Sequence, residues 1–143
     1  MPGREQIAKL IPHQGAMCLL ERVIEWDEPH IVLATATHRA PQNPLRAGGR
    51  LRSVHLCEYG AQAMAVHGGL SARAAGHAAQ PGFLVSLREV QLHVAYLEQL
   101  QGDLHVSAER LFDGGTSWQY AFEIRHDARI LAQGRAAIIS RPR

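Results

Sequence analysis

The chain has 143 residues, of which 46% are hydrophobic and 20% are charged, and its formal net charge is +2. This length and composition are typical of a soluble globular protein, and we expect a single domain over residues 1–143. The small net charge and the lack of a long basic run give no support to nucleic-acid binding. Because the chain has neither a run of about 20 apolar residues nor an apolar signal segment, we expect a cytoplasmic protein with no membrane partner.

The first part of the chain predicts a short helix and two strands. Residues 4–11 form an amphipathic pattern that Pro12 ends. Strands over 17–26 and 31–37 follow, joined by a polar turn. Residues 38–46 contain two prolines and predict an irregular loop.

The middle of the chain predicts one long helix, from about residue 50 to residue 70, with residues 71–81 as a loop or a frayed extension of it. Small side chains lie on several sides of this helix, which is not the pattern of a surface helix with one apolar stripe. Small residues let a sheet approach a helix closely. They are Gly60, Ala61, Ala63, Ala65 and Gly69.

The last part of the chain predicts strands alone, over 83–96, 103–112, 117–125 and 129–140. The sequence Asp113-Gly114-Gly115 is a hairpin signal between two of these strands. One long helix and five or six antiparallel strands bury a common core only if the sheet curls around the helix. The prediction is therefore an α+β hotdog fold, in which an antiparallel five- to six-stranded sheet wraps around one long central helix.

Glu58 is the one carboxylate of the long helix, and its neighbours are mostly apolar or small. A carboxylate in such surroundings is costly unless it has a partner or a task, so it favours a functional reading. A structural glutamate that accepts hydrogen bonds is the alternative. Gln62 follows one helical turn later and could hydrogen-bond the carboxyl group and fix its rotamer.

Two motifs resemble those of the FabZ/FabA-like 3-hydroxyacyl-acyl-carrier-protein dehydratases. Residues 11–23 read IPHQGAMCLLERV, similar to the family's LPHRYPFLLVDRV-type segment, and residues 58–62 read EYGAQ, similar to its E-A-x-A-Q helix motif. Residues 82–112 are more weakly similar to the family's third and fourth strands. The stretch from Asn43 to Arg46, followed by residues 58–65, resembles the ApeP-like branch from aryl polyene pigment clusters.

This resemblance implies a protein of fatty acid or aryl polyene biosynthesis that acts on acyl chains carried by phosphopantetheine on acyl carrier protein, without a cofactor. In the family, a loop histidine is the base, a helix carboxylate is the acid, and the two come from different chains of a dimer. Glu58 falls at the position of the acid. The position of the base falls on Asn43-Pro44, so the family's histidine is not matched.

Three histidines of this chain could replace the missing base. His38 begins the same loop, His55 lies one turn before Glu58, and His13 stands in the Leu-Pro-His position, where the resemblance implies a structural role. We take His38 and His55 as the candidate catalytic residues, with a packing or surface role as the alternative for each. His55 and Glu58 have a spacing that metal ligands can use, but no second ligand pair accompanies them, and no metal is predicted.

Candidate substrate contacts surround the start of the long helix. Gly48 and Gly49 could allow the close backbone approach that a thioester carbonyl needs, while Asn43 and Gln62 supply amides. Arg46, with Arg50 and Arg52, could hold an acidic acyl carrier protein and its phosphate. An ordinary solvated face is the alternative for these arginines.

Four functions stay open from the sequence. The chain could be a working dehydratase with a relocated histidine, or an incomplete subunit that needs a second hotdog chain. The dimer could be a homodimer or a heterodimer with another hotdog dehydratase. We favour the incomplete subunit because Asn43-Pro44 occupy the position of the base. An acyl-CoA or acyl-carrier-protein thioesterase that uses Asn43, Glu58 and Gln62 is a further alternative, and so is a non-catalytic partner that stabilises another dehydratase.

Overall fold

The structure is a computed structural model that describes residues 1–78 and 82–140. It contains two α-helices, three short 3₁₀ turns and six strands. In chain order these are α1 (Arg4–Leu10), η1 (Gly15–Met17), β1 (Arg22–Trp26), β2 (His30–Thr35), η2 (Thr37–Arg39), η3 (Ser53–His55), α2 (Leu56–Ala74), β3 (Gly82–Leu92), β4 (Leu104–Asp113), β5 (Ser117–His126) and β6 (Arg129–Ser140).

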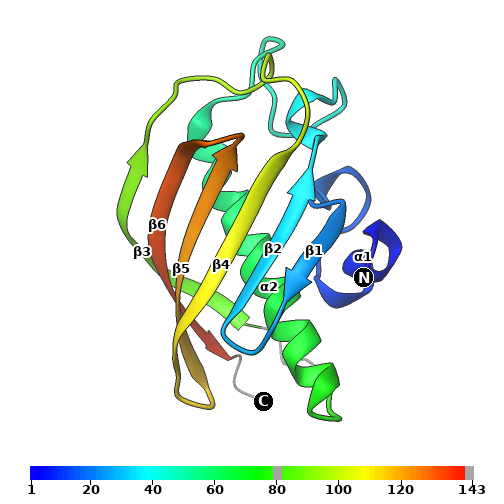
Figure 1. The fold of residues 1–143 in the computed structure, drawn as a ribbon, viewed down its shortest axis with the longest axis vertical. Helices are drawn as coiled ribbons and strands as arrows, with labels where there is room; N and C mark the ends of the chain where they lie inside the picture. The colour runs from blue at the N-terminus through cyan, green and yellow to red at the C-terminus, as the bar shows by residue number, and fades with distance from the viewer. Residues whose placement is uncertain (79–81, 141–143) are drawn as a thin grey trace.

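The six strands form one sheet in the order β1-β2-β4-β5-β6-β3, with every neighbouring pair antiparallel. The sheet curls around α2, and α1 lies beside β1 (Figure 1). The inward side chains of the strands and those of α2 share one hydrophobic core. The predicted α+β hotdog fold is thereby confirmed, with six strands.

The close approach of sheet and helix rests on two glycines and one aromatic ring. A Cβ atom added to Gly60 of α2 would lie 2.6 Å from Cδ2 of Phe122, and one added to Gly134 of β6 would lie 2.8 Å from Cζ of the same ring. Both distances are shorter than any van der Waals contact, so the ring fills the whole space between the two backbones. Gly60 therefore has the packing role that the sequence predicts, whereas Gly69 lies against Leu10 of α1 rather than against the sheet.

The long helix begins and ends later than predicted. Residues 51 and 52 are not helical, because the backbones of Leu51 and Ser53 hydrogen-bond to Leu97 and Ala95. The 3₁₀ turn η3 follows, and α-helical geometry starts only at Leu56 and continues to Ala74, after which Gly76 adopts a φ of 83°. Residues 71–81 were predicted as a loop or a frayed extension of the helix; the first four are helical, and residues 79–81 lie outside the described part of the chain.

Two predicted strands are shorter than expected. β1 begins at Arg22 rather than residue 17, because the backbone of Met17 and Leu19 bonds to the side chain of Gln62 in place of a neighbouring strand. β3 ends at Leu92 rather than residue 96, because the chain there leaves the sheet to bridge the segment that precedes α2. Both differences arise from long-range contacts that local periodicity does not encode.

The two edges of the sheet differ. The edge of β1 is covered by the N-terminal residues: the backbone N–H of Val23 donates to the carbonyl of Pro2 at 2.9 Å, and Gly3 bridges Arg22. β3 forms the opposite edge, where its one sheet neighbour among the described strands is β6. Its apolar side chains on both faces are between 38% and 52% exposed, among them Leu84, Val85, Leu87, Val90 and Leu92.

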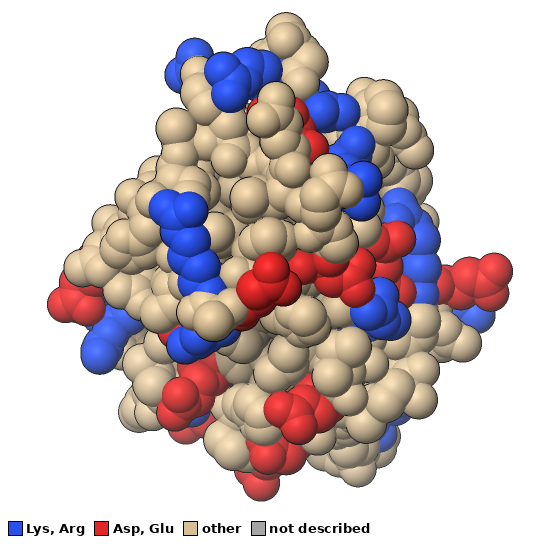
Figure 2. Space-filling model, turned by 45° about the horizontal axis from the view of Figure 1, so that its top comes forward, with Lys and Arg blue, Asp and Glu red and all other residues tan. Residues whose placement is uncertain are grey.

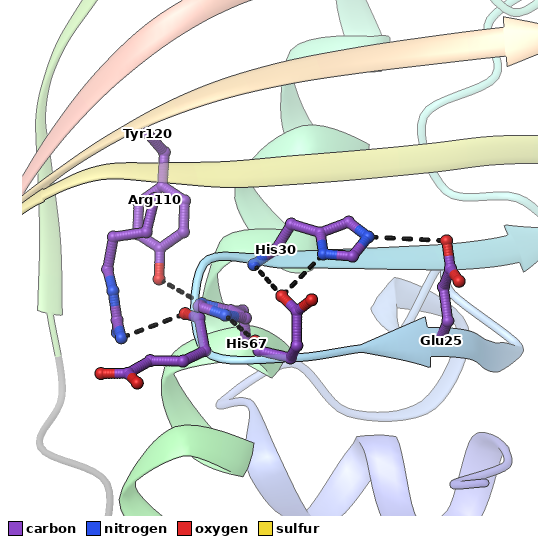
Figure 3. A network of polar contacts seen from close by, with 7 residues as sticks. Glu25, His30, His67, Arg110 and Tyr120 are labelled. Carbon is purple, nitrogen blue, oxygen red and sulfur yellow. Dashed lines mark hydrogen bonds and ion pairs between the residues drawn. The ribbon is translucent and has the colours of Figure 1, made fainter.

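A buried histidine attaches the β1–β2 turn to α2 and the sheet (Figure 3). His67 of α2 is fully buried, and its Nε2 lies 2.9 Å from the carbonyl of Asp27 while its Nδ1 lies 2.7 Å from the hydroxyl of Tyr120. A carbonyl only accepts, so Nε2 donates, and in the neutral ring Nδ1 accepts from the hydroxyl of Tyr120. Arg110 adds a bond to the carbonyl of Glu28. Neutral His67 is therefore the form that fits this site.

Acidification is expected to weaken this attachment. Burial, followed by the nearby charge of Arg110, lowers the pKa of His67, and the bonds to the turn and the charge of Asp27 only partly oppose this. The unfolded chain then binds the proton at a higher pH than the folded chain does. His67 stabilises the fold fully above its unfolded pKa of about 6.5, and this contribution is lost as the pH falls below that value.

Urea unfolding at about pH 7.5 and about pH 5.5, on either side of that pKa, measures the effect. The His67→Gln variant should lose less stability between the two pH values than the original chain does. This comparison separates His67 from His38, whose pKa burial also lowers. Equal losses in the two proteins would show that His67 does not titrate on unfolding.

Candidate functional site

Glu58 lies in the first turn of α2, and its carboxyl group meets two other side chains. Its Oε1 is 2.9 Å from Nε2 of His13 and 3.1 Å from Nε2 of Gln62. The Glu58 side chain is 33% exposed, although Tyr59 and Gln62 on the same helix are fully buried. The carboxylate is therefore accessible at the rim of the core.

Gln62 holds the N-terminal segment of the chain against α2. Its Oε1 accepts the backbone N–H of Leu19 at 2.9 Å, and its Nε2 donates to the carbonyl of Met17 at 2.7 Å as well as to Glu58. The predicted hydrogen bond between Gln62 and Glu58 is present in the structure. Because both ends of the amide are engaged with this chain, Gln62 acts here as a fixed support for the carboxylate.

His13 is the histidine that the structure brings to Glu58. It follows α1 and Pro12, and its side chain is 28% exposed. Its Nδ1 is buried and has no hydrogen-bond partner in the described part of the chain. The sequence prediction for His13 was a structural role, because the residue matches the Leu-Pro-His position of the resemblance. The sequence signal that could have drawn attention to His13 is its match, at unchanged spacing, within the segment of residues 11–23.

The structure does not bring His38 to Glu58. His38 lies in η2, is fully buried, and its Nε2 bonds to the carbonyl of Leu100 at 2.8 Å. His55 is half-buried at the end of η3, immediately before α2. In the described part of the chain, the Glu58 carboxyl group contacts His13 and Gln62. Catalytic roles for His38 and His55 stay predictions.

Asn43, where the sequence resemblance expects the base, connects the loop after β2 to α2. Its Nδ2 donates to the carbonyl of Thr37 at 2.9 Å and to the hydroxyl of Tyr59 at 3.1 Å, and its Oδ1 accepts the N–H of Leu45 at 2.9 Å. The side chain is buried, and every polar group of the amide has a partner within this chain. The structure therefore gives Asn43 a structural role, and its predicted contact with substrate stays untested.

The glycine pair and the arginines lie in the loop before the helix. Gly48 and Gly49 have φ values of 60° and 77° and form an exposed turn, so they are not at the start of α2 as the predicted helix required. Arg46 donates to the carbonyl of Gly49 and braces this turn. Arg50 stacks on Tyr96, with its guanidinium carbon 3.4 Å from the ring centroid.

The loops after β2 and after β3 form the top of the molecule in Figure 1. This loop end carries charges of both signs. Figure 2 brings this end forward and shows basic side chains at its upper tip and acidic side chains across its middle. A cavity of ≈ 290 Å³ opens between α1, η1 and the loop after β2, and a second of ≈ 380 Å³ lies over β4 and β5. The lining of neither cavity includes Glu58 or His13.

Among the described residues, no group of three or more His, Cys, Asp or Glu side chains is placed to hold a metal ion. No helix there combines the length and the apolar character needed to cross a membrane.

The sheet curls around one helix, and this helix carries a carboxylate that is paired with a histidine. Together these features define a hotdog protein with a candidate acid–base site. The sequence model of the ApeP-like family, described as ApeP dehydratase, matches residues 5–142. The chain belongs to this family.

Solved structures show the same fold. The dehydratase heterocomplex ApeI:P from Xenorhabdus doucetiae matches with a TM-score of 0.86 and 24% identity, over 96% of this chain and 91% of that chain. AziG from S. sahachiroi matches with a TM-score of 0.66 and 17% identity, over 92% and 97%. Zebra fish thioesterase superfamily member 2 matches with a TM-score of 0.64 and 16% identity, over 96% and 95%. No curated protein matches the chain.

Proposed function

We propose that this chain is the Glu58-bearing subunit of a dehydratase that removes water from 3-hydroxyacyl thioesters on acyl carrier protein, in fatty acid or aryl polyene biosynthesis. The observation that carries the proposal is the Glu58 carboxyl group, which is one-third exposed and fixed through one of its two oxygens. An accessible carboxyl group with a fixed orientation suits proton transfer to a bound substrate.

The proposed reaction needs two proton transfers. A base removes the proton from Cα, the electron pair forms the Cα–Cβ double bond, and the Cβ–O bond breaks. Glu58 gives its proton to the leaving hydroxyl group, which departs as water. The proton on the base and the vacancy on Glu58 are then exchanged with solvent, so the net change is the loss of one water molecule from the thioester.

The base is proposed to come from a second hotdog chain. Asn43 stands where the resemblance places a histidine, and all of its polar groups are engaged within the chain. Neither of the two cavities described above includes Glu58 in its lining. The family match and the similarity to a dehydratase heterocomplex support a heterodimer.

The partner is proposed to pair along β3, the exposed apolar edge of the sheet. An open edge strand with apolar side chains on both faces attracts a further strand, and in isolation it favours aggregation. A second hotdog chain offers the same kind of edge, so the two sheets could join into one. Acyl carrier protein, which is acidic, is proposed to dock on the loop end, where Arg39, Arg50 and Arg52 are exposed.

Reconstitution tests the proposal. The chain is purified alone and after co-expression with each other hotdog dehydratase of its own organism. Each preparation receives a 3-hydroxyacyl thioester on acyl carrier protein, and formation of the conjugated enoyl thioester is followed by its ultraviolet absorbance. We expect activity from one complex and at most a hundredth of that rate from the chain alone, because the latter lacks the base.

Other outcomes would favour the remaining functions. Full activity of the chain alone would refute the need for a partner. Release of free thiol from acyl-CoA, without enoyl product, would point to a thioesterase. A complex whose turnover does not change when Glu58 is replaced would show a non-catalytic stabilising subunit.

A further inference from the structure

We propose that His13 is a positioning residue of the Glu58 site, and that it assigns different tasks to the two oxygens of the carboxyl group. His13 and Gln62 together hold Oε1, so Oε2 is the oxygen that exchanges a proton with the substrate. The inference deepens the proposed dehydratase function and rests on it, because the substrate is the one that this function assumes. The hydrogen-bond geometry stands without it.

The orientation of Gln62 is the first step of the argument. The backbone N–H of Leu19 can only donate, so the Gln62 atom that it meets at 2.9 Å is the carbonyl oxygen. The other end of the amide is therefore the NH₂ group, which meets the carbonyl of Met17 at 2.7 Å and Oε1 of Glu58 at 3.1 Å. An NH₂ group can only donate, so Oε1 accepts.

The tautomer of His13 follows from this. Oε1 already accepts from Gln62, and Nε2 of His13 lies 2.9 Å from the same atom. A proton on Nε2 gives Oε1 a second donor, whereas a proton on Nδ1 would bury an N–H without a partner in the described part of the chain. An unpaired buried donor costs more than an unpaired lone pair on this ring. His13 therefore carries its proton on Nε2.

The two oxygens of Glu58 consequently differ. Oε1 is held by donors from two separate parts of the chain, the segment after α1 and the next turn of α2. Such an oxygen has no room for a proton of its own, so the proton that acid catalysis requires sits on Oε2. Oε2 has no hydrogen bond or ion pair with the described residues, and the atom belongs to a side chain that is one-third exposed.

This arrangement also explains the form of the segment 11–23. Pro12 ends α1 at the point where the chain turns towards α2, and the next residue is His13. Gln62 then fixes residues 17–19 to the same helix face. The segment is thus fixed before His13 by the end of α1 and after it by Gln62, so a change in its length would move His13 away from Glu58.

Nuclear magnetic resonance of the full chain with ¹⁵N-labelled histidine tests the tautomer directly. The spectrum of His13→Gln, which lacks one signal set, assigns the His13 ring. We expect the proton on Nε2 at mildly alkaline pH, and a changed Nε2 resonance in Glu58→Leu, because that variant lacks the acceptor of the Nε2–H. An Nδ1–H tautomer in the unaltered chain would overturn the inference. This readout does not depend on any enzymatic activity.

Activity of the reconstituted complex tests the positioning role. His13→Leu removes the donor and should lower kcat about tenfold or more with little change in KM. His13→Gln keeps an N–H donor at the position of Nε2 and should recover most of that loss. His77→Gln, at an exposed position, is the control.

If His13→Gln is as impaired as His13→Leu, the ring itself is needed and His13 acts as a base rather than a positioning residue. If neither variant differs from the unaltered complex, His13 has no part in the reaction. If the unaltered complex shows no dehydration at all, the proposed function fails, and the resonance experiment alone decides the tautomer.

Discussion

Glu58→Gln should lower kcat for dehydration by the reconstituted complex about a hundred- to ten-thousand-fold, the usual contribution of a general acid. The Gln side chain has the shape of Glu, and its oxygen can still accept from His13 and Gln62, so the fold should be kept. It cannot release a proton to the leaving hydroxyl group. Initial rates of enoyl thioester formation, together with a thermal unfolding curve, measure the two effects separately.

Glu28→Gln provides the matched control, since Glu28 is exposed in the β1–β2 turn and the substitution makes the same change of charge. Its rate should equal that of the unaltered complex. A Glu58→Gln complex that retains more than a tenth of the original rate, with an unaltered fold, would exclude Glu58 as the proton donor.

Leu87→Glu in β3 should weaken the association with the partner chain at least about tenfold, because it places a charge in an apolar interface. The side chain of Leu87 is 39% exposed in the single chain, so the isolated variant should fold with nearly unchanged stability. Sedimentation of the mixed subunits over a range of concentrations measures the dissociation constant.

The other edge of the sheet offers the control for this experiment. Ile24 of β1 is 43% exposed, and Ile24→Glu makes a similar change where the N-terminal residues cover part of the edge. Its dissociation constant should match that of the unaltered chain. If Ile24→Glu prevents association and Leu87→Glu does not, the partner binds at β1 and the proposed arrangement is wrong.

Periodicity and turn signals were sufficient for the main elements of this fold. The alternation of the C-terminal strands and the Asp113-Gly114-Gly115 turn predict β4, β5 and β6 closely, because each strand pairs with a sequence neighbour. Boundaries failed where distant backbone segments meet. The pairing of residues 51–53 with 95–97 keeps the start of α2 at Leu56, and no local pattern within residues 50–56 predicts this pairing.

The candidate site could be predicted only in part for the same reason. Glu58 and Gln62 are one helical turn apart, so their hydrogen bond follows from local geometry. His13 reaches Glu58 through the course of the chain after α1, which no short-range pattern describes. Asn43 was predicted as a substrate contact from its place in the loop, while its burial against Tyr59 is visible only in three dimensions.

The ring of Phe122 packs tightly against both Gly60 and Gly134, so it joins three positions that are far apart in the sequence. At this point the space between α2 and the strands β5 and β6 leaves no room for a methyl group at either glycine. Since Gly60 lies two residues after Glu58, any added carbon there would push the helix outward and carry the carboxylate with it. The geometry of the candidate site is thus coupled to the far wall of the core.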